Sequence, residues 1–430
     1  MIIRDPVHGD IEISEEERRV LDTGAMQRLR AIKQLGAAYL VYPGCVHTRF
    51  DHSLGTLHTA SRVIDALRRR GHAVSPDDAR LVRMSALVHD VSHIPFGHTF
   101  EDERKVFPRH DTPERLRRFL RAGELGDLLE ELGLGAAVYE LLTRPVDWRG
   151  QIVSGTLDAD LLDYLRRDAY FAGLSQGYDD RIYHYFCIES GQLAVDLTKR
   201  GLERYDARSE IVHLLRLRYF LTERVYFHHA KVIAGAMVSK ALELATGMGV
   251  REEDLYDKGD ETLLAYLEAV GRERAGPSGD GGAVVELVRG VRRRRLYKRA
   301  YVLTCAGVSP AERARLVSAY HADVENRRRL EEEIARRAGV APWDVIVYCP
   351  AHTALKEASV LARRPWGVER LDERRRDLEL DAIAAQYEQI WRFWVFARPG
   401  VEEAVGRAAE EALGLPSELR RRTDRCGPGT

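Results

Sequence analysis

Histidine is crowded into one short stretch of this chain. Eight of the 15 histidines, at positions 47, 52, 58, 72, 89, 93, 98 and 110, fall within a 64-residue window of the 430-residue sequence. An even spread would place about two there. Structural histidines occur anywhere in a chain, so this clustering favours a functional site.

The His89-Asp90 pair lies at the end of an apolar helix. Ser75-Pro76-Asp77-Asp78 is a strong signal for the helix start, and Pro95 ends the pattern. An ionised carboxylate in that setting is costly unless something pairs with it. A divalent metal ion is a natural partner, because imidazole nitrogens and carboxylate oxygens bind such ions. His52, and Asp160 at the start of another helix, are available as further ligands. A salt-bridged pair within the core is the alternative.

Composition excludes several classes of protein. Hydrophobic residues make up 45% of the chain and charged residues 31%, with 66 Lys+Arg against 67 Asp+Glu. This excludes wholesale disorder and a globally basic nucleic-acid binder. No run approaches the roughly 20 apolar residues of a membrane helix, and the start does not resemble a signal peptide. The five cysteines (45, 187, 305, 349 and 426) are scattered, which is typical of a reducing compartment. We therefore expect a soluble, cytoplasmic protein without a membrane partner.

The pattern of helix and strand signals predicts a mainly α fold. A short apolar hairpin is expected at the start, then helices beginning at Ser14 and near His52. Strands are expected at 344–349 and 392–396, with a helix at 378–390 between them. The composition of 274–282 predicts an exposed loop. The expected regions are a catalytic core at 1–200, a helical extension at 201–330, a small α+β lobe at 331–415, and a frayed tail at 416–430.

The ordered set His52, His89-Asp90 and Asp160 resembles the signature of the HD-domain metal-dependent phosphohydrolases. Longer stretches resemble one branch, the deoxynucleoside triphosphate triphosphohydrolases, which include the animal enzyme that joins a sterile alpha motif to an HD domain. These stretches are Asp5-Pro-Val-His-Gly9, Gln27-Arg-Leu-Arg30, Lys33-Gln-Leu-Gly36, Tyr42-Pro-Gly44, Thr48-Arg-Phe-Asp-His-Ser-Leu-Gly55 and His89-Asp-Val-Ser-His-Ile-Pro-Phe-Gly-His98. The resemblance is dense over residues 1–235 and looser beyond them.

The resemblance implies an all-helical HD-domain core and a metal-dependent reaction. His52, His89, Asp90 and Asp160 would hold a divalent ion, which could be Fe, Mn, Zn, Ni, Co or Mg. Activated water would attack the α-phosphorus of a deoxynucleotide and release a deoxynucleoside and triphosphate. The implied catalytic residues are Arg49, His93, Asp160 and His98, with His98 as general acid. The implied substrate-binding residues are Gln34, Leu35, Arg49, His93, His98, His110, Tyr164, Asp168, Arg218 and Tyr226. A homodimer or larger homo-oligomer is also implied.

One departure from the family opens alternatives. The family often has a lysine directly after the second aspartate, and this chain has Leu161, so a phosphate cation is missing unless Arg166, Arg167 or Lys231 replaces it. A phosphohydrolase or phosphodiesterase acting on other nucleotides is therefore an alternative. A nucleotide-binding sensor with little turnover is another.

Two further features carry weaker expectations. Asp22, Gln27 and Arg30 match part of a family allosteric site, but Arg4 stands where that site usually has asparagine. The basic run Arg292–Arg295, with Lys298 and Arg299, is expected to be a solvated surface, and anion binding or a subunit contact is the alternative. A nucleic-acid partner is not favoured.

Overall fold

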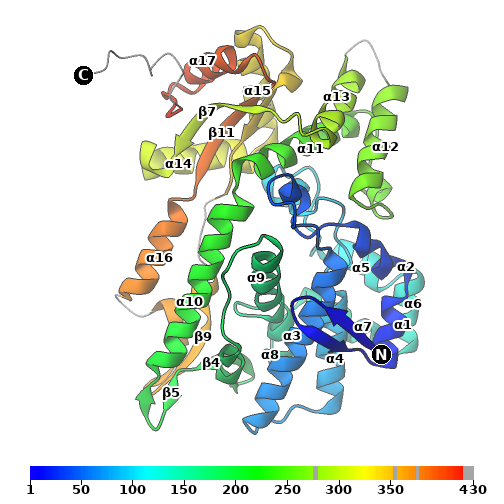
Figure 1. Cartoon of the computed structure of the whole chain (residues 1–430), viewed down its shortest axis with the longest axis vertical. Coiled ribbons are helices and arrows are strands. Elements are labelled where there is room, and N and C mark those ends of the chain that lie inside the picture. The colour runs from blue at the N-terminus through cyan, green and yellow to red at the C-terminus, as the bar shows by residue number, and fades with distance from the viewer. Residues whose placement is uncertain (275–278, 352–355, 374–376, 420–430) are drawn as a thin grey trace.

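Capped helices carry most of the structure, a computed structural model that describes residues 1–274, 279–351, 356–373 and 377–419 (Figure 1). The expected capping box of Ser14 and Glu17 begins α1 (Glu15–Leu21). Ser75 and Asp78 form another at the start of α4 (Pro76–Val88). The helix expected near His52 is α3 (Arg49–Arg69), which begins earlier because Thr48 and Asp51 also form a capping box. The mainly α fold class is confirmed.

The N-terminal part opens with the expected hairpin and continues with helices. Its regular elements are β1 (Ile2–Asp5), β2 (Gly9–Glu12), α1, α2 (Gly24–Arg28), α3, α4, α5 (Pro113–Leu120), α6 (Gly123–Glu131), α7 (Gly135–Thr143), α8 (Trp148–Val153), α9 (Ala159–Phe171), β3 (Phe186–Glu189), β4 (Gln192–Asp196), β5 (Thr198–Lys199) and β6 (Leu202–Glu203). Helix α3 packs against both α4 and α9. This packing places the start of α3, the end of α4 and the start of α9 next to one another.

The C-terminal part combines long helices with short strands. Its regular elements are α10 (Tyr205–Leu221), α11 (His229–Gly247), α12 (Asp260–Glu273), α13 (Asp280–Arg292), β7 (Lys298–Thr304), α14 (Pro310–Val317), α15 (Val324–Ala338), β8 (Val345–Tyr348), β9 (Leu361–Arg364), β10 (Gly367–Arg370), α16 (Leu378–Glu388), β11 (Arg392–Ala397) and α17 (Glu402–Leu413). Short 3-10 and π-helical turns join many of them, including the π-helical turns η3 (Thr99–Glu103) and η5 (Thr222–Tyr226).

The predicted strands at 344–349 and 392–396 are confirmed as β8 and β11, and the helix between them as α16. A third strand was not predicted. β7 lies on the other side of β11, in an antiparallel sheet of order β7-β11-β8, although its segment was expected to be helical. The exposed Lys298 and Arg299 hide its strand signal, while Tyr301 and Leu303 are buried. The sheet packs beside α15 and α17 (Figure 1).

A second sheet joins distant parts of the chain. Its order is β10-β9-β4-β3, and β9 pairs with β4 in parallel, Val195 opposite Ala362. The segment at 361–370 therefore docks on the N-terminal core, a contact that the sequence did not reveal. Thus the small lobe expected at 331–415 does not hold all of its own strands together.

The predicted loop, tail, free cysteines and absence of membrane helices can each be compared with the described residues. Residues 275–278 of the expected loop and residues 420–430 of the expected tail, with Cys426, lie outside the described residues. In the described part of the tail, Ser417 and Glu418 accept hydrogen bonds from the backbone of β7 and are not frayed. The other four cysteines are free thiols. Among the described helices, none has the length and apolar character needed to cross a bilayer.

A buried ionic network connects the core to the C-terminal region. Arg104 follows η3 and pairs with Glu331 on α15 (2.9 Å) and Glu243 on α11 (2.5 Å). Glu331 also pairs with Lys240 (2.6 Å) and accepts the Val347 N–H of β8 (2.8 Å). Arg327 completes the network at 2.9 Å from Glu243. Because these groups are nearly inaccessible to water, each charge depends on its partners.

Replacing Glu331 by glutamine should destabilise the protein by about 3–5 kcal/mol, because Arg104 and Lys240 would remain buried with less opposing charge. Urea unfolding followed by tryptophan fluorescence measures this. Glu325→Gln is the matched control, because Glu325 lies on the same helix but is exposed and makes only long contacts with Arg328 and Arg329. Its effect should stay within about 0.5 kcal/mol. Equal effects of the two substitutions would contradict the role of the network.

Candidate active site

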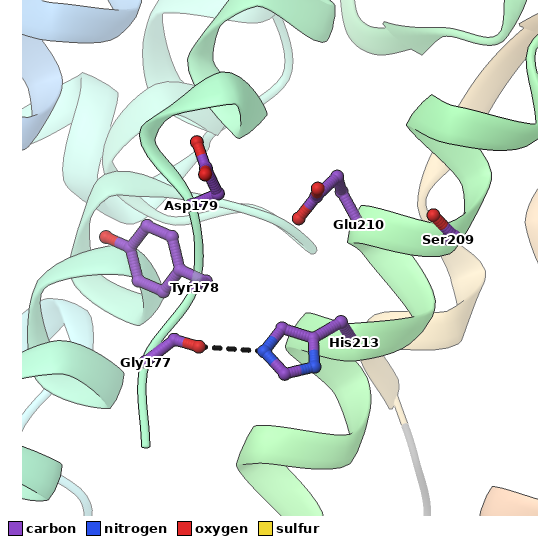
Figure 2. Close-up of a pocket in the computed structure, with 6 residues that line it drawn as sticks. All are labelled: Gly177, Tyr178, Asp179, Ser209, Glu210 and His213. Carbon is purple, nitrogen blue, oxygen red and sulfur yellow. Dashed lines mark hydrogen bonds between the residues drawn. The ribbon is translucent and has the colours of Figure 1, made fainter. Parts of the chain in front are cut away.

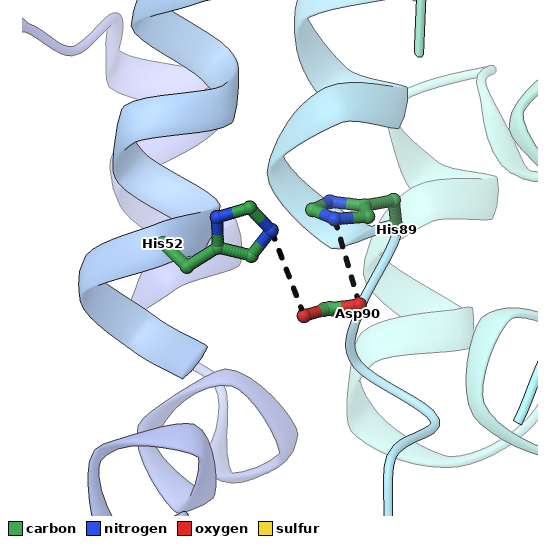
Figure 3. Close-up of side chains that lie close together, drawn as sticks. All are labelled: His52, His89 and Asp90. Carbon is green, nitrogen blue, oxygen red and sulfur yellow. Dashed lines mark ion pairs between the residues drawn. The ribbon is translucent and has the colours of Figure 1, made fainter. Parts of the chain in front are cut away.

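The four predicted metal ligands come together where three helix ends meet. His52 lies in the first turn of α3, His89 caps the end of α4 with Asp90 next to it, and Asp160 lies in the first turn of α9. Ligand atoms of His52, His89 and Asp90 lie within 4.8 Å of one another (Figure 3). Asp160 Oδ1 is 2.9 Å from His52 Nε2 and 3.9 Å from His89 Nε2. The sequence prediction of this grouping therefore agrees with the geometry.

The donor atoms of this cluster fit a divalent ion. The Nε2 atoms of His52 and His89 are both buried and make no well-aligned hydrogen bond, and carboxylate oxygens of Asp90 and Asp160 lie 2.9–3.9 Å from them. His89 Nδ1 lies 2.8 Å from the Ala86 carbonyl oxygen, which only accepts, so Nδ1 carries the proton and Nε2 offers its lone pair. Two imidazole nitrogens facing two carboxylates are a ligand set that binds Zn, Fe, Mn and similar ions.

Asp163 supports the cluster from behind, and the sequence analysis missed it. His52 Nδ1 donates to it at 2.7 Å, and His8 Nε2 lies 2.6 Å from its other oxygen. Arg167 donates to both oxygens and also pairs with Asp5 at 2.8 Å. Burial opposes ionisation of Asp163, but Arg167 and the two histidines hold its pKa well below its usual value. The carboxylate thus fixes the ring orientation of His52.

Gly55 is required by this arrangement. A Cβ at position 55 would lie 1.9 Å from Asp163 Oδ1 and 2.4 Å from Arg167 Nη2. Two sequence signals could have pointed to this contact. Asp163 follows Asp160 by one helical turn, and His8 lies in the Asp5-Pro-Val-His-Gly9 stretch.

Three further predicted histidines gather beside the cluster. The His93 and His110 rings stack with centroids 3.5 Å apart, and the His98 ring lies 5.0 Å from His93. His110 Nδ1 is 2.9 Å from Glu101, which also pairs with Arg115. Burial, and then the charge of Arg49, lower the pKa of His93 well below its usual value, so this ring is neutral. His98 is half exposed and pairs with Asp102 at 2.8 Å.

A strained turn places these rings. Phe96 has a left-handed φ of 59°, and its N–H bonds Asp260 at 3.2 Å. Gly97 follows with φ 23°, where a Cβ would come within 2.8 Å of His93 Nδ1. The Pro95-Phe96-Gly97 turn that ends the helical pattern therefore lets His93 and His98 approach each other.

Arg49 lies at the junction between the metal ligands and these histidines. Its Nη1 is 2.6 Å from Asp90 Oδ2, and only 3% of its side chain is exposed. Burial opposes ionisation of Asp90, but the charge of Arg49 keeps its pKa well below its usual value. The guanidinium is therefore next to the predicted reacting centre.

The residues predicted to contact the sugar and base form a second group. Tyr226 donates to Asp168 at 2.7 Å, and His47, to which the sequence analysis gave no role, lies 2.8 Å from the other Asp168 oxygen. The Arg218 guanidinium is 5.6 Å from the centre of the Tyr164 ring. Leu35 packs against the same apolar cluster as Tyr164 and Tyr226. The side-chain oxygen of Gln34 is buried without a partner in the described structure.

The cations suggested as replacements for the missing lysine are already engaged. Arg167 is held by Asp163 and Asp5, Arg166 pairs with Asp180 at 2.6 Å, and Lys231 pairs with Glu103 at 2.9 Å. Leu161 itself is buried in the core. The expectation that one of the three is available for a phosphate is therefore not supported by these contacts.

The weaker expectations concern surfaces away from the cluster. Arg30 donates to Gln27 at 3.0 Å and covers the Phe50 ring, whereas Asp22 pairs with Arg18. Their allosteric role stays a prediction. The basic run begins at the end of α13. Arg292 pairs with Glu268, and Arg293, Arg294 and Arg295 are exposed after the helix, as the solvated interpretation expects.

A surface hollow of about 510 Å³ lies between the segment after α9 and helix α10 (Figure 2). It is lined by Gly177, Tyr178, Asp179, Ser209, Glu210 and His213. His213 Nε2 donates to the Gly177 carbonyl oxygen at 2.7 Å. No predicted site residue lines this hollow, and His213 is already hydrogen-bonded to the backbone. The group of predicted metal ligands is therefore the better candidate site.

Comparison with known proteins supports the same region. Residues 49–168 match the profile of the HD domain, and residues 211–424 match that of the HD associated region. An uncharacterized protein of Methanocaldococcus jannaschii is 30% identical over 380 residues, 86% of this chain and 74% of that protein. The deoxynucleoside triphosphate triphosphohydrolase SAMHD1 of Gallus gallus is 29% identical over 282 residues, and the human protein 28% over 276. The chain matches only 45% and 44% of their lengths.

Solved structures share the fold. A phosphohydrolase of Bacteroides thetaiotaomicron superposes with a TM-score of 0.69 and 21% identity, covering 93% of this chain and all of that chain. A hypothetical protein from Aquifex aeolicus gives the same TM-score at 22% identity and covers 95% of this chain and 99% of that chain. At these identities the likeness concerns the fold alone.

Replacing Asp163 by asparagine should weaken metal binding by about 10–100-fold, because His52 loses the acceptor that orients it. Metal affinity is measured by calorimetric titration of metal-free protein, with circular dichroism to confirm folding. Asp180→Asn, which changes an exposed carboxylate nearby, should leave the affinity unchanged. An unaltered affinity in folded Asp163→Asn protein would contradict the supporting role.

Proposed function

We propose that this chain, which belongs to the HD-domain family with an HD associated region, hydrolyses deoxynucleoside triphosphates at the α-phosphorus. The products would be a deoxynucleoside and triphosphate. One observation supports the proposal most directly. The side chains of His52, His89, Asp90 and Asp160 lie close together, next to Arg49 and the three clustered histidines. When bound there, a divalent ion activates water and polarises a phosphoryl oxygen.

The protein's own groups supply the remaining chemistry. Arg49, already buried against Asp90, can donate to an α-phosphoryl oxygen that approaches the cluster. His98 is the exposed member of the histidine group, and Asp102 holds one of its ring nitrogens. The other nitrogen can deliver a proton to the departing 5′ oxygen. The His93 and His110 rings would line the position of the phosphates and form hydrogen bonds with their oxygens.

The second group gives the reason for proposing a deoxynucleotide. Asp168 is fixed by His47 and Tyr226, which suits a carboxylate that accepts a sugar hydroxyl. Leu35 next to Gln34 presents an apolar surface to a ribose 2′ position. Relatives named as deoxynucleoside triphosphate triphosphohydrolases point the same way. A homo-oligomer, testable by light scattering, is part of this proposal.

A second candidate follows from the engaged cations. Because Arg166, Arg167 and Lys231 are all paired with carboxylates, few free positive charges are available for a long phosphate chain. The substrate of this second candidate is a nucleotide with fewer phosphates, or a cyclic nucleotide. This candidate keeps the same metal ligands and the same attack on phosphorus.

Incubating the purified protein with each deoxynucleoside triphosphate and Mn²⁺ or Mg²⁺ should yield equal amounts of deoxynucleoside and triphosphate. In oxygen-18 water, the label should enter the triphosphate, because water attacks the phosphorus. Asp160→Ala should reduce the rate by at least about 10³-fold, since it removes a metal ligand. Asp180→Asn is the surface control and should retain the parent rate.

The products separate the alternatives. Formation of a nucleoside mono- or diphosphate from the triphosphates would contradict cleavage of the bond between the α-phosphorus and the 5′ oxygen. Faster turnover of monophosphates or cyclic nucleotides than of triphosphates would favour the second candidate. Thermal stabilisation by nucleotides that survives Asp160→Ala, with no turnover in the parent, would identify a sensor.

A further inference from the structure

A second concave surface shares no lining residue with the predicted metal ligands or with the clustered histidines. It runs between α5 and α7 and encloses about 1060 Å³. Its apolar lining comes from Pro113, Ala122, Ala136 and the ring of Tyr139, and four arginines (117, 118, 121 and 144) also line it. Pockets for small ligands are typically of the order of 300–1000 Å³, so this hollow is large enough for one.

The positive charge in this groove is only partly compensated. Arg121 pairs with Glu130, and the Arg117 guanidinium lies 5.7 Å from the centre of the Tyr139 ring. Within the part of the chain that the structure describes, Arg117, Arg118 and Arg144 form no ion pair. Two glutamates, 114 and 140, line the same hollow, so its four arginines leave a net charge of +2, against −1 for the whole chain. A compact anion is therefore the complementary ligand.

The surroundings of the groove disfavour a long polyanion. The adjacent helix α6 carries four exposed acids, Glu124, Asp127, Glu130 and Glu131. A nucleic-acid strand that continued past the groove in this direction would meet these carboxylates, which repel phosphates. A short phosphate chain can be bound without reaching them.

We propose that the α5–α7 groove binds a small polyphosphate anion, either free or as part of a nucleotide. Guanidinium groups suit this ligand because each can donate two parallel hydrogen bonds to phosphoryl oxygens. Tyr139 offers a surface for a nucleoside if one is attached. This binding goes beyond the proposed hydrolysis and does not depend on it.

Helix α5 also connects the groove to the active site. Arg117 and Arg118 face the groove, while Arg115, two residues earlier, is buried on the opposite side. Arg115 pairs with Glu101 at 2.5 Å and donates to the Pro108 carbonyl oxygen, and Glu101 pairs with His110. An anion bound to α5 is thus linked, through Arg115 and Glu101, to the segment that holds the His93–His110 stack.

The test is calorimetric titration of the full-length protein with sodium tripolyphosphate in the presence of EDTA, which keeps the metal site empty. We expect a binding event whose affinity falls at least about tenfold in the double variant Arg117→Glu/Arg118→Glu, whereas any binding of tripolyphosphate beside Arg49 is unchanged in that variant. The matched control, Arg328→Glu/Arg329→Glu, makes the same change of charge on two exposed neighbouring arginines of α15 and should keep the parent affinity. Arg144→Gln, a milder change at the other end of the groove, should also weaken binding.

The ligand series and the outcomes decide the assignment. Equal affinities for tripolyphosphate and a deoxynucleoside triphosphate support recognition of the phosphate chain alone. Tighter binding of the nucleotide supports an additional contact between Tyr139 and the nucleoside. Equal weakening in the groove and control variants would overturn the proposal, because binding would then be non-specific. Binding of a single-stranded oligonucleotide but not of tripolyphosphate, lost in Arg117→Glu/Arg118→Glu, would overturn the choice of a small ligand.

Discussion

The buried carboxylate of Asp163 is the contact on which the rest of the site depends. It accepts from His52 of α3 and lies against His8 of the N-terminal hairpin, and Arg167 compensates its charge while also holding Asp5. A buried carboxylate is stable only when its lone pairs and charge are matched. Those partners come from the hairpin, α3 and α9, so satisfying one charge fixes three elements. The predicted metal ligands His52 and Asp160 lie on two of them.

This dependence explains which features could be predicted from sequence. The N-terminal ends of α1 and α4 are determined by local capping boxes, Ser14 with Glu17 and Ser75 with Asp78. Such local signals can be recognised directly in the sequence. His89 and Asp90 follow from the end of α4. The predicted metal ligands were therefore accessible to sequence reasoning, although their convergence rested on the resemblance to a family rather than on geometry.

The features that escaped prediction depend on distant partners. The spacing of Asp163, one helical turn after Asp160, is only a weak signal, and its supporting role becomes evident when His8, more than 150 residues earlier, is placed against it. His47 acquires a role only through Asp168, and β7 only through β11. The availability of Arg166, Arg167 and Lys231 could not be judged either, because pairing with acids elsewhere in the chain decides it. The near-equal totals of acidic and basic residues thus conceal an interior with many specific ion pairs.

The parallel pairing of β4 with β9 has a consequence for the order of folding. The two strands are separated by more than 160 residues, so closing this sheet involves a long loop in the chain. During synthesis, the N-terminal helices leave the ribosome well before β9 exists, and β4 then presents an unpaired edge. A nascent chain that stops short of β9 carries all four predicted metal ligands but an incomplete sheet. Truncation near the carboxyl end would therefore endanger solubility before it affected the residues of the reaction centre.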